Sequence, residues 1–173
     1  MNSIIPYKII SYILLFFAFI FTLSGLLVLM FALASPVLLF TFLLIAFIVT
    51  YIISSFIFLQ RGIIAGKKLK PRLERNIRRT AYVVLFFAVM NLFQIISGLY
   101  HPAAINESID QMLSLQKNSL HTATPYSPDL FHKVVKITMY IMAFGAATML
   151  IHVYETFKFL KQYAHLFSEE QQL

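Results

Sequence analysis

The sequence predicts an all-α integral membrane protein in which a single domain, residues 1–173, crosses the membrane with four helices. Three observations support this prediction. The chain is 60% hydrophobic and only 12% charged, with a mean hydropathy of +0.79, whereas about a quarter of the residues in soluble proteins are charged. Residues 9–60 contain no charged side chain, and eight of the fourteen basic residues fall within residues 61–80. Long apolar runs that flank a short basic loop are typical of multi-pass membrane proteins.

The uncharged N-terminal run is long enough for two spans, which we place at residues 7–31 and 36–60. A transmembrane helix needs about 20 apolar residues. Pro36 suits the first position of a helix and disfavours a helical conformation at Ser35, so the turn falls before it. The two spans are therefore expected to form a helical hairpin.

Residues 61–80 form a basic loop with one acidic residue, Glu74. Short loops rich in Lys and Arg remain on the cytoplasmic side. Both termini are then cytoplasmic, and we expect a multi-pass protein of the plasma (bacterial inner) membrane. Within the loop, Pro71 can begin a short helix that ends at Arg79. Seven basic residues are expected to contact anionic lipid headgroups or an acidic partner, namely Lys67, Lys68, Lys70, Arg72, Arg75, Arg78 and Arg79.

The second half of the chain contains two further spans, at residues 81–100 and 134–159. The polar loop between them, residues 101–132, lies outside the membrane in this topology. Helical spacing of apolar side chains within it predicts a short amphipathic helix on the outer surface. These side chains are Ile105, Ile109, Met112 and Leu113.

Polar residues inside the later spans are the main candidates for function, because polar groups are costly in lipid. Asn91 and Gln94 share a face of the third span, and Thr148, His152 and Glu155 share a face of the fourth. We expect the second stripe to meet Tyr51 and Ser54 or Ser55 of the second span. Such a polar face either holds the helices together by hydrogen bonds or forms a pocket for protons or substrate.

Enzymatic and cofactor chemistry has little support in the sequence. The chain has no cysteine and no nucleophile or dinucleotide-binding motif, and its five histidines lack a dense metal-ligand spacing. We therefore expect no catalytic residue, metal or cofactor. The alternative is a haem or metal site on the outer side, at His101 and His132, where His121 and Asp129 lie nearby in the sequence.

Three functions remain open on the sequence. The first is a non-enzymatic accessory or scaffold subunit of a membrane complex, with lipids, other membrane subunits or further copies of itself as partners and no role for nucleic acid. The second is a small transporter or channel that uses the intramembrane polar face. The third is a membrane enzyme or cytochrome subunit with the outer histidine site.

Overall fold

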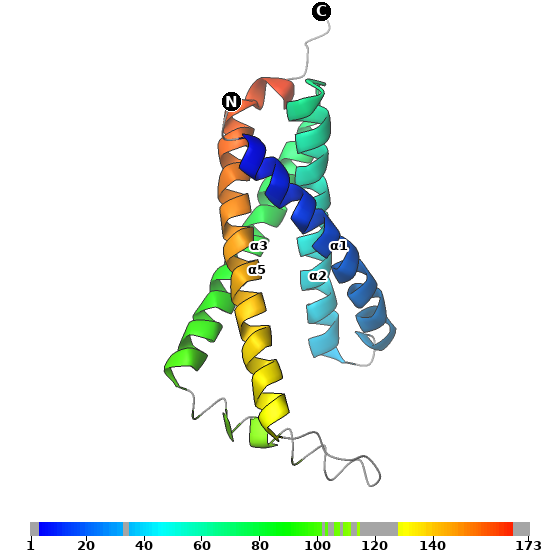
Figure 1. Cartoon of the computed structure of the whole chain (residues 1–173). Helices are drawn as coiled ribbons and strands as arrows, with labels where there is room; N and C mark the ends of the chain where they lie inside the picture. The colour runs from blue at the N-terminus through cyan, green and yellow to red at the C-terminus, as the bar shows by residue number, and fades with distance from the viewer. Residues whose placement is uncertain are drawn as a thin grey trace, which may run out of the picture. The chain divides into compact units, whose positions relative to one another are not determined.

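The computed structural model describes residues 4–32, 35–101, 103, 106–107, 109–111, 114 and 128–167. Long helices account for most of them (Figure 1). In chain order the elements are α1 (Ile4–Ala32), α2 (Pro36–Ile57), the π-helix η1 (Phe58–Ile64), α3 (Pro71–Tyr100), α5 (Pro128–Gln162) and the 3-10 helix η2 (Ala164–Phe167). In the part of the chain that the structure describes, four helices are long and apolar enough to cross a membrane, as in a multi-pass helical membrane protein.

The helices extend beyond the predicted spans, most of all in α3. We expected a separate short helix in the basic loop, but α3 runs without a break from Pro71 to Tyr100. Neither Gly nor Pro interrupts residues 72–80, and Arg, Leu and Glu favour helix. An ion pair of 2.8 Å between Glu74 and Arg78, four residues apart, adds to the stability of this first part of α3.

The helical path after α2 also continues past the predicted end of the second span. From Phe58 the chain forms the π-helix η1, and its last turn closes with the Ala65 N–H donating to the Gln60 carbonyl at 3.1 Å. Gly66 follows with a positive φ of 62°, a conformation that glycine adopts without steric cost. The helix therefore ends at the start of the cationic segment, residues 66–70.

The described chain divides into two compact units. The first combines Met1–Phe87 with Met149–Leu173, and the second is Ala88–Thr148. The first unit thus holds the α1–α2 hairpin, the beginning of α3 and the end of α5, and the second holds the remaining parts of α3 and α5. The prediction of a single domain stays a prediction.

Within the first unit, α1 packs along α2 (Figure 1). Small buried residues recur at every seventh position of α1: Ser11, Ala18, Gly25 and Ala32. A Cβ atom added to Gly25 would lie 3.1 Å from the Ile45 Cγ2 atom of α2. In lipid, small residues promote helix association because they let two backbones approach closely.

The beginning of α1, the end of α5 and the basic loop meet at one end of the first unit. The Tyr7 and Phe159 rings pack with centroids 4.8 Å apart. The Leu69 N–H donates to the Leu166 carbonyl at 2.8 Å, which ties the loop to η2. Phe58, Phe159 and Leu160 are fully buried there.

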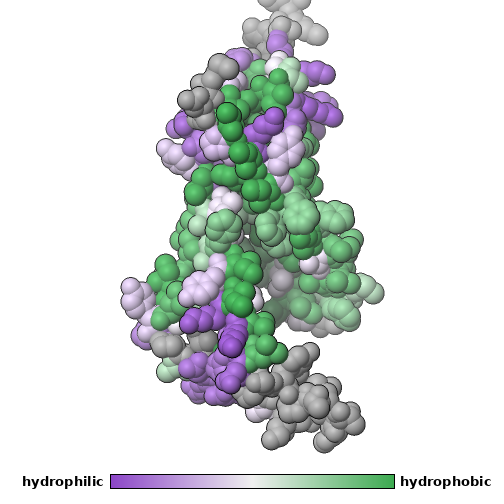
Figure 2. Space-filling model, viewed as in Figure 1, coloured by the Kyte–Doolittle hydropathy of each residue, from purple (hydrophilic) through white to green (hydrophobic). Residues whose placement is uncertain are grey.

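The hairpin surface away from this end is apolar. In Figure 2 it is coloured green, for hydrophobic residues, over α1 and α2. Phe19, Met30 and Phe40 are 70%, 75% and 63% exposed. Contiguous apolar surface of this extent suits contact with lipid chains or other membrane helices.

Candidate functional site

A buried polar cluster centred on His152 joins three helices of the first unit. The His152 side chain has no exposed surface. Its Nε2 atom lies 3.0 Å from the Ser11 Oγ atom of α1, and its Nδ1 atom lies 2.8 Å from the Tyr51 hydroxyl of α2. Both imidazole nitrogens therefore have partners on neighbouring helices, which buried polar groups require.

Thr156, one turn after His152, connects the two tyrosines of the cluster. The Thr156 Oγ1 atom lies 3.0 Å from the Tyr51 hydroxyl and 3.2 Å from the Tyr7 hydroxyl. The Tyr7 ring stacks on the His152 imidazole with centroids 5.0 Å apart and planes inclined by 16°. All five residues, Tyr7, Ser11, Tyr51, His152 and Thr156, are at least 99% buried.

Helical spacing explains why each helix contributes to the same point. Tyr7 and Ser11 are four residues apart in α1, and His152 and Thr156 are four apart in α5, so each pair shares one helix face. Ser11 and Thr156 also donate to carbonyls of their own helices, those of Tyr7 and His152, each at 2.7 Å. Tyr51 reaches the cluster from α2.

The hydroxyl groups fit one tautomer of a neutral imidazole. The Ser11 hydroxyl gives its single hydrogen to the Tyr7 carbonyl, so it accepts from the His152 Nε2–H. The Tyr51 hydroxyl then donates to Nδ1. A complete set of hydrogen bonds without net charge is compatible with the interior of a membrane.

The residues predicted to face this stripe have different partners. Tyr51 contacts His152 as expected. Ser54 instead accepts a hydrogen bond of 3.1 Å from the Asn76 amide of α3. Ser55 donates to the Ile52 carbonyl of its own helix.

Glu155 does not join the cluster. Its Oε2 atom lies 3.5 Å from the Lys158 Nζ atom, close enough for an ion pair, but it accepts no hydrogen bond from the described residues. Although the two residues share a helix face, no hydrogen bond joins His152 and Glu155 among the described residues.

The other predicted polar residues, Asn91, Gln94 and Thr148, belong to the second unit. Gln94 is exposed and Asn91 is half-buried. Within the described residues of that unit, neither side-chain amide has a hydrogen-bond partner. Thr148 donates to the Phe144 carbonyl of its own helix at 2.8 Å.

Sequence reasoning missed Tyr7 and Ser11, although both are central to the cluster. The signal was present, because Ser11 begins the seven-residue repeat of small residues in α1 and Tyr7 lies one turn before it. Hydropathy alone does not distinguish these two residues within the uncharged first span. A search for polar side chains at helical spacing would have found the pair.

The basic residues of the loop are mostly exposed on the protein surface. Six of the seven predicted lipid or partner contacts are exposed: Lys67, Lys68, Lys70, Arg72, Arg75 and Arg79. The seventh, Arg78, is half-buried and pairs with Glu74.

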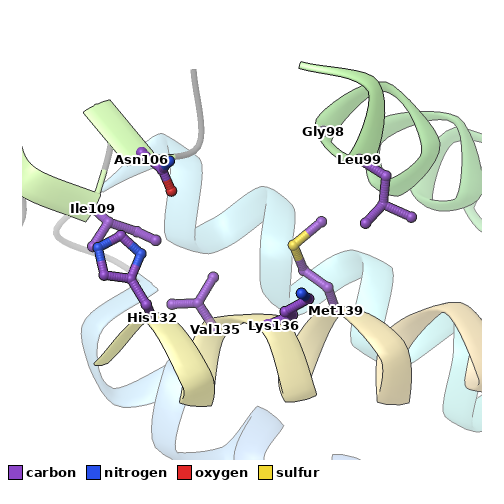
Figure 3. Close-up of a pocket in the computed structure, with 8 residues that line it drawn as sticks. All are labelled: Gly98, Leu99, Asn106, Ile109, His132, Val135, Lys136 and Met139. Carbon is purple, nitrogen blue, oxygen red and sulfur yellow. The ribbon is translucent and has the colours of Figure 1, made fainter. Parts of the chain in front are cut away.

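The second unit contains a cavity of 350 Å³ that His132 lines (Figure 3). Asn106 and Lys136 are its other polar lining residues, and Ile109, Val135 and Met139 contribute apolar surface. His101 does not line it, and His121 lies outside the described residues. Among the residues that the structure describes, no three His, Asp or Glu side chains are grouped to hold a metal ion.

Compared with protein-family models, curated proteins and solved structures, the chain matches none of them. The function therefore has to be argued from the geometry of this multi-pass helical protein alone.

Proposed function

We propose that this protein is a non-enzymatic accessory or scaffold subunit of a membrane complex. The observation that carries the proposal is the pair of amides on α3. Asn91 and Gln94 lie within a candidate span, three residues apart, and have no hydrogen-bond partner among the described residues of their own unit. An amide left without a partner in hydrocarbon costs several kcal/mol (~2 to 7, depending on the reference).

A helix of a partner subunit supplies what these amides lack. Asn, Gln, Ser and Thr side chains form hydrogen bonds between transmembrane helices, and small residues let the helices approach. The second unit also contains Gly145, where an added Cβ atom would meet nothing within 4 Å. Both features favour helix association over exposure to lipid chains.

The His152 cluster supports an internal structural role more than a transport role. The Ser11 and Thr156 hydroxyls donate to the backbone carbonyls of Tyr7 and His152, so the hydrogen bonds of the cluster stay inside the first unit. Neither the cavity at His132 nor the one beside the basic loop is lined by any residue of the cluster. A transported proton or substrate needs an entry path, so the transporter alternative has less support.

The proposed orientation in the plasma (bacterial inner) membrane places both termini and the basic loop in the cytoplasm. The meeting of α1, the end of α5 and the loop at one end of the first unit supports it, as does the retention of Lys and Arg inside. On the outer side we propose the short amphipathic helix. Asn106, Glu107 and residues 109–111 are helical and Ile109 is buried, while Ile105, Met112 and Leu113 lie outside the described residues.

Reporter fusions test this orientation. A reporter that is active only in the cytoplasm should be active when fused at Lys68 or at the C-terminus, and inactive at Gln116. The physical reason is the cost of moving the eight basic residues of 61–80 across the bilayer. Activity at Gln116 but not at Lys68 would reverse the whole topology.

Site-specific photocrosslinking tests the accessory role. A photoreactive residue at Met90, one turn before Gln94 and exposed, should form an adduct with another membrane protein. The double change Asn91→Leu/Gln94→Leu should reduce that adduct about fivefold to thirtyfold, since two interhelical hydrogen bonds contribute ~1 to 2 kcal/mol. Mass spectrometry of the adduct identifies the partner.

The control is a photoreactive residue at Ile96, which is 50% exposed and lies on the opposite side of α3 from the amides. It should yield only lipid adducts, with or without the amides. An equal yield of protein adducts at both positions would contradict the proposal. So would a yield at Met90 that does not change in the double variant. Adducts formed only with a second copy of this chain would indicate a homo-oligomer instead.

A further inference from the structure

The basic loop surrounds a cavity rather than presenting its charges on a flat surface. The cavity has a volume of 680 Å³, within the range of small-molecule sites, about 300–1,000 Å³. Four cationic residues line it: Arg61 from η1, and Lys67, Lys68 and Lys70 from the segment that leads into α3. Among the described residues, no acid lines it, and Glu74, the only acid of the loop, pairs with Arg78.

Two further features define what the cavity can hold. The helix α3 begins at Pro71, immediately after Lys70, and the N-terminus of a helix carries a partial positive charge that favours anions. The remaining lining residues are apolar: Ile57, Leu69 and Leu73. A ligand that fits both parts has a concentrated negative charge joined to an apolar portion.

The fold holds this arrangement in place. The Leu69 N–H donates to the Leu166 carbonyl, the Lys67 N–H donates to the Arg61 carbonyl at 3.0 Å, and the Leu73 N–H donates to the Lys70 carbonyl at 2.9 Å. These bonds fix the segment between η1 and α3 at three points. The backbone that carries the cationic side chains is therefore ordered before a ligand binds, which reduces the entropic cost of binding.

We propose that this cavity, the loop cavity, binds the phosphate-bearing headgroup of an anionic lipid. Arg61, Lys67 and Lys70 bind the phosphate oxygens, and the apolar residues contact the glycerol and the first carbons of the acyl chains. This site differs from diffuse attraction to a charged membrane surface, because it depends on the lining cations and not on the total charge of the loop. It is also independent of the accessory role, which rests on the amides of α3.

Binding to the purified full-length protein in detergent tests the proposal. The probes are short-chain phosphatidic acid and phosphatidylglycerol, with phosphatidylcholine as the zwitterionic comparison. We expect both anionic lipids to bind the natural protein. The lining variant Arg61→Gln/Lys70→Gln should weaken their binding roughly tenfold to thirtyfold, at ~1 kcal/mol for each cation removed.

The matched control removes two charges from the same loop outside the cavity. In Arg75→Gln/Arg79→Gln both altered residues are exposed and neither lines the cavity, so we expect less than a threefold change. All four positions are exposed, and thermal unfolding of each variant checks that the fold is retained. Equal weakening in the two variants, or no preference for anionic over zwitterionic lipid, would overturn the proposal.

Competition distinguishes the possible sources of the anion. Inorganic phosphate at millimolar concentration should not displace the anionic lipids, because it lacks the apolar portion. If phosphate displaced the lipids from the natural protein but not from the lining variant, the cavity would still be a phosphate site. Its ligand would then be a free anion and not a lipid, which would overturn the lipid assignment. Displacement by an acidic peptide at lower concentration than either would overturn the lipid assignment in favour of a protein partner.

Discussion

The change His152→Ala is expected to lower the free energy of unfolding by about 3 kcal/mol, at the lower end of the large-to-small substitutions in cores. The substitution leaves a cavity where a fully buried side chain packs against the Tyr7 ring. It also removes one of the two hydrogen-bond partners of the Ser11 hydroxyl and one of the two of the Tyr51 hydroxyl. Thermal unfolding in detergent measures the effect as a large fall in midpoint temperature.

Ile151→Ala is the matched control for this prediction. Ile151 precedes His152 in α5 and its side chain is 54% exposed, so its truncation leaves no internal cavity. We expect a change below about 1 kcal/mol, as for most surface substitutions. An equal effect of the two alanine variants would mean that the His152 cluster does not stabilise the bundle.

The hydrogen-bond part of this effect is measured by comparing Thr156→Val with Thr148→Val. Both threonines donate to the carbonyl four residues earlier in α5, but only Thr156 also contacts Tyr7 and Tyr51. The change to valine conserves volume. The difference between the two variants should be about 1 kcal/mol, the usual range for hydrogen bonds between membrane helices.

Gly62→Leu is expected to have the second large effect, about 2 to 3 kcal/mol, as for overpacking of a tight core. A Cβ atom at Gly62 would lie 2.8 Å from the Leu69 Cδ1 atom, 3.1 Å from the Phe58 Cδ2 atom and 3.4 Å from the Leu166 Cδ1 atom. A leucine cannot fit without separating η1 from the loop and from η2. Limited proteolysis should then cleave residues 164–167 faster, and the midpoint of thermal unfolding should fall.

Two further variants show whether the cause is local overpacking. Ala65→Leu places the same side chain three residues later at an exposed position, so it should leave both measurements nearly unchanged. Gly62→Ala should have a small effect, because its nearest neighbour is the end of a flexible leucine side chain. If Gly62→Leu left proteolysis at residues 164–167 unchanged, the close packing of η1 against the loop and η2 would be contradicted.

The sequence by itself determined the class of the protein and the positions of its spans. Hydropathy and charge are local properties, and a run without charge from Ile9 to Gln60 has no stable place outside an apolar environment. Pro36 marked the start of the second helix, where α2 begins. The boundaries were less well predicted where no local signal ends a helix, as at Pro71, from which α3 continues directly into the third span.

The tertiary structure decided which polar groups meet. His152 was a candidate from its place in an apolar span, but its partners depend on which helix faces pack together. Ser11 is 141 positions away in the sequence, and nothing local relates the two. Conversely, Glu155 shares a helix face with His152 in the sequence pattern, yet it pairs with Lys158. The face of α5 that carries both residues is wider than the part of it that contacts α1 and α2.

The loop cavity shows the same division between sequence and structure. The eight basic residues of 61–80 were visible as a charge pattern, which predicts attraction to anionic groups in general. Which four of them line one cavity depends on the π-helical end of the second span and on the bond from Leu69 to Leu166. Charge is a property of composition, whereas a binding site requires side chains from separate segments to be held at one place by backbone contacts between those segments.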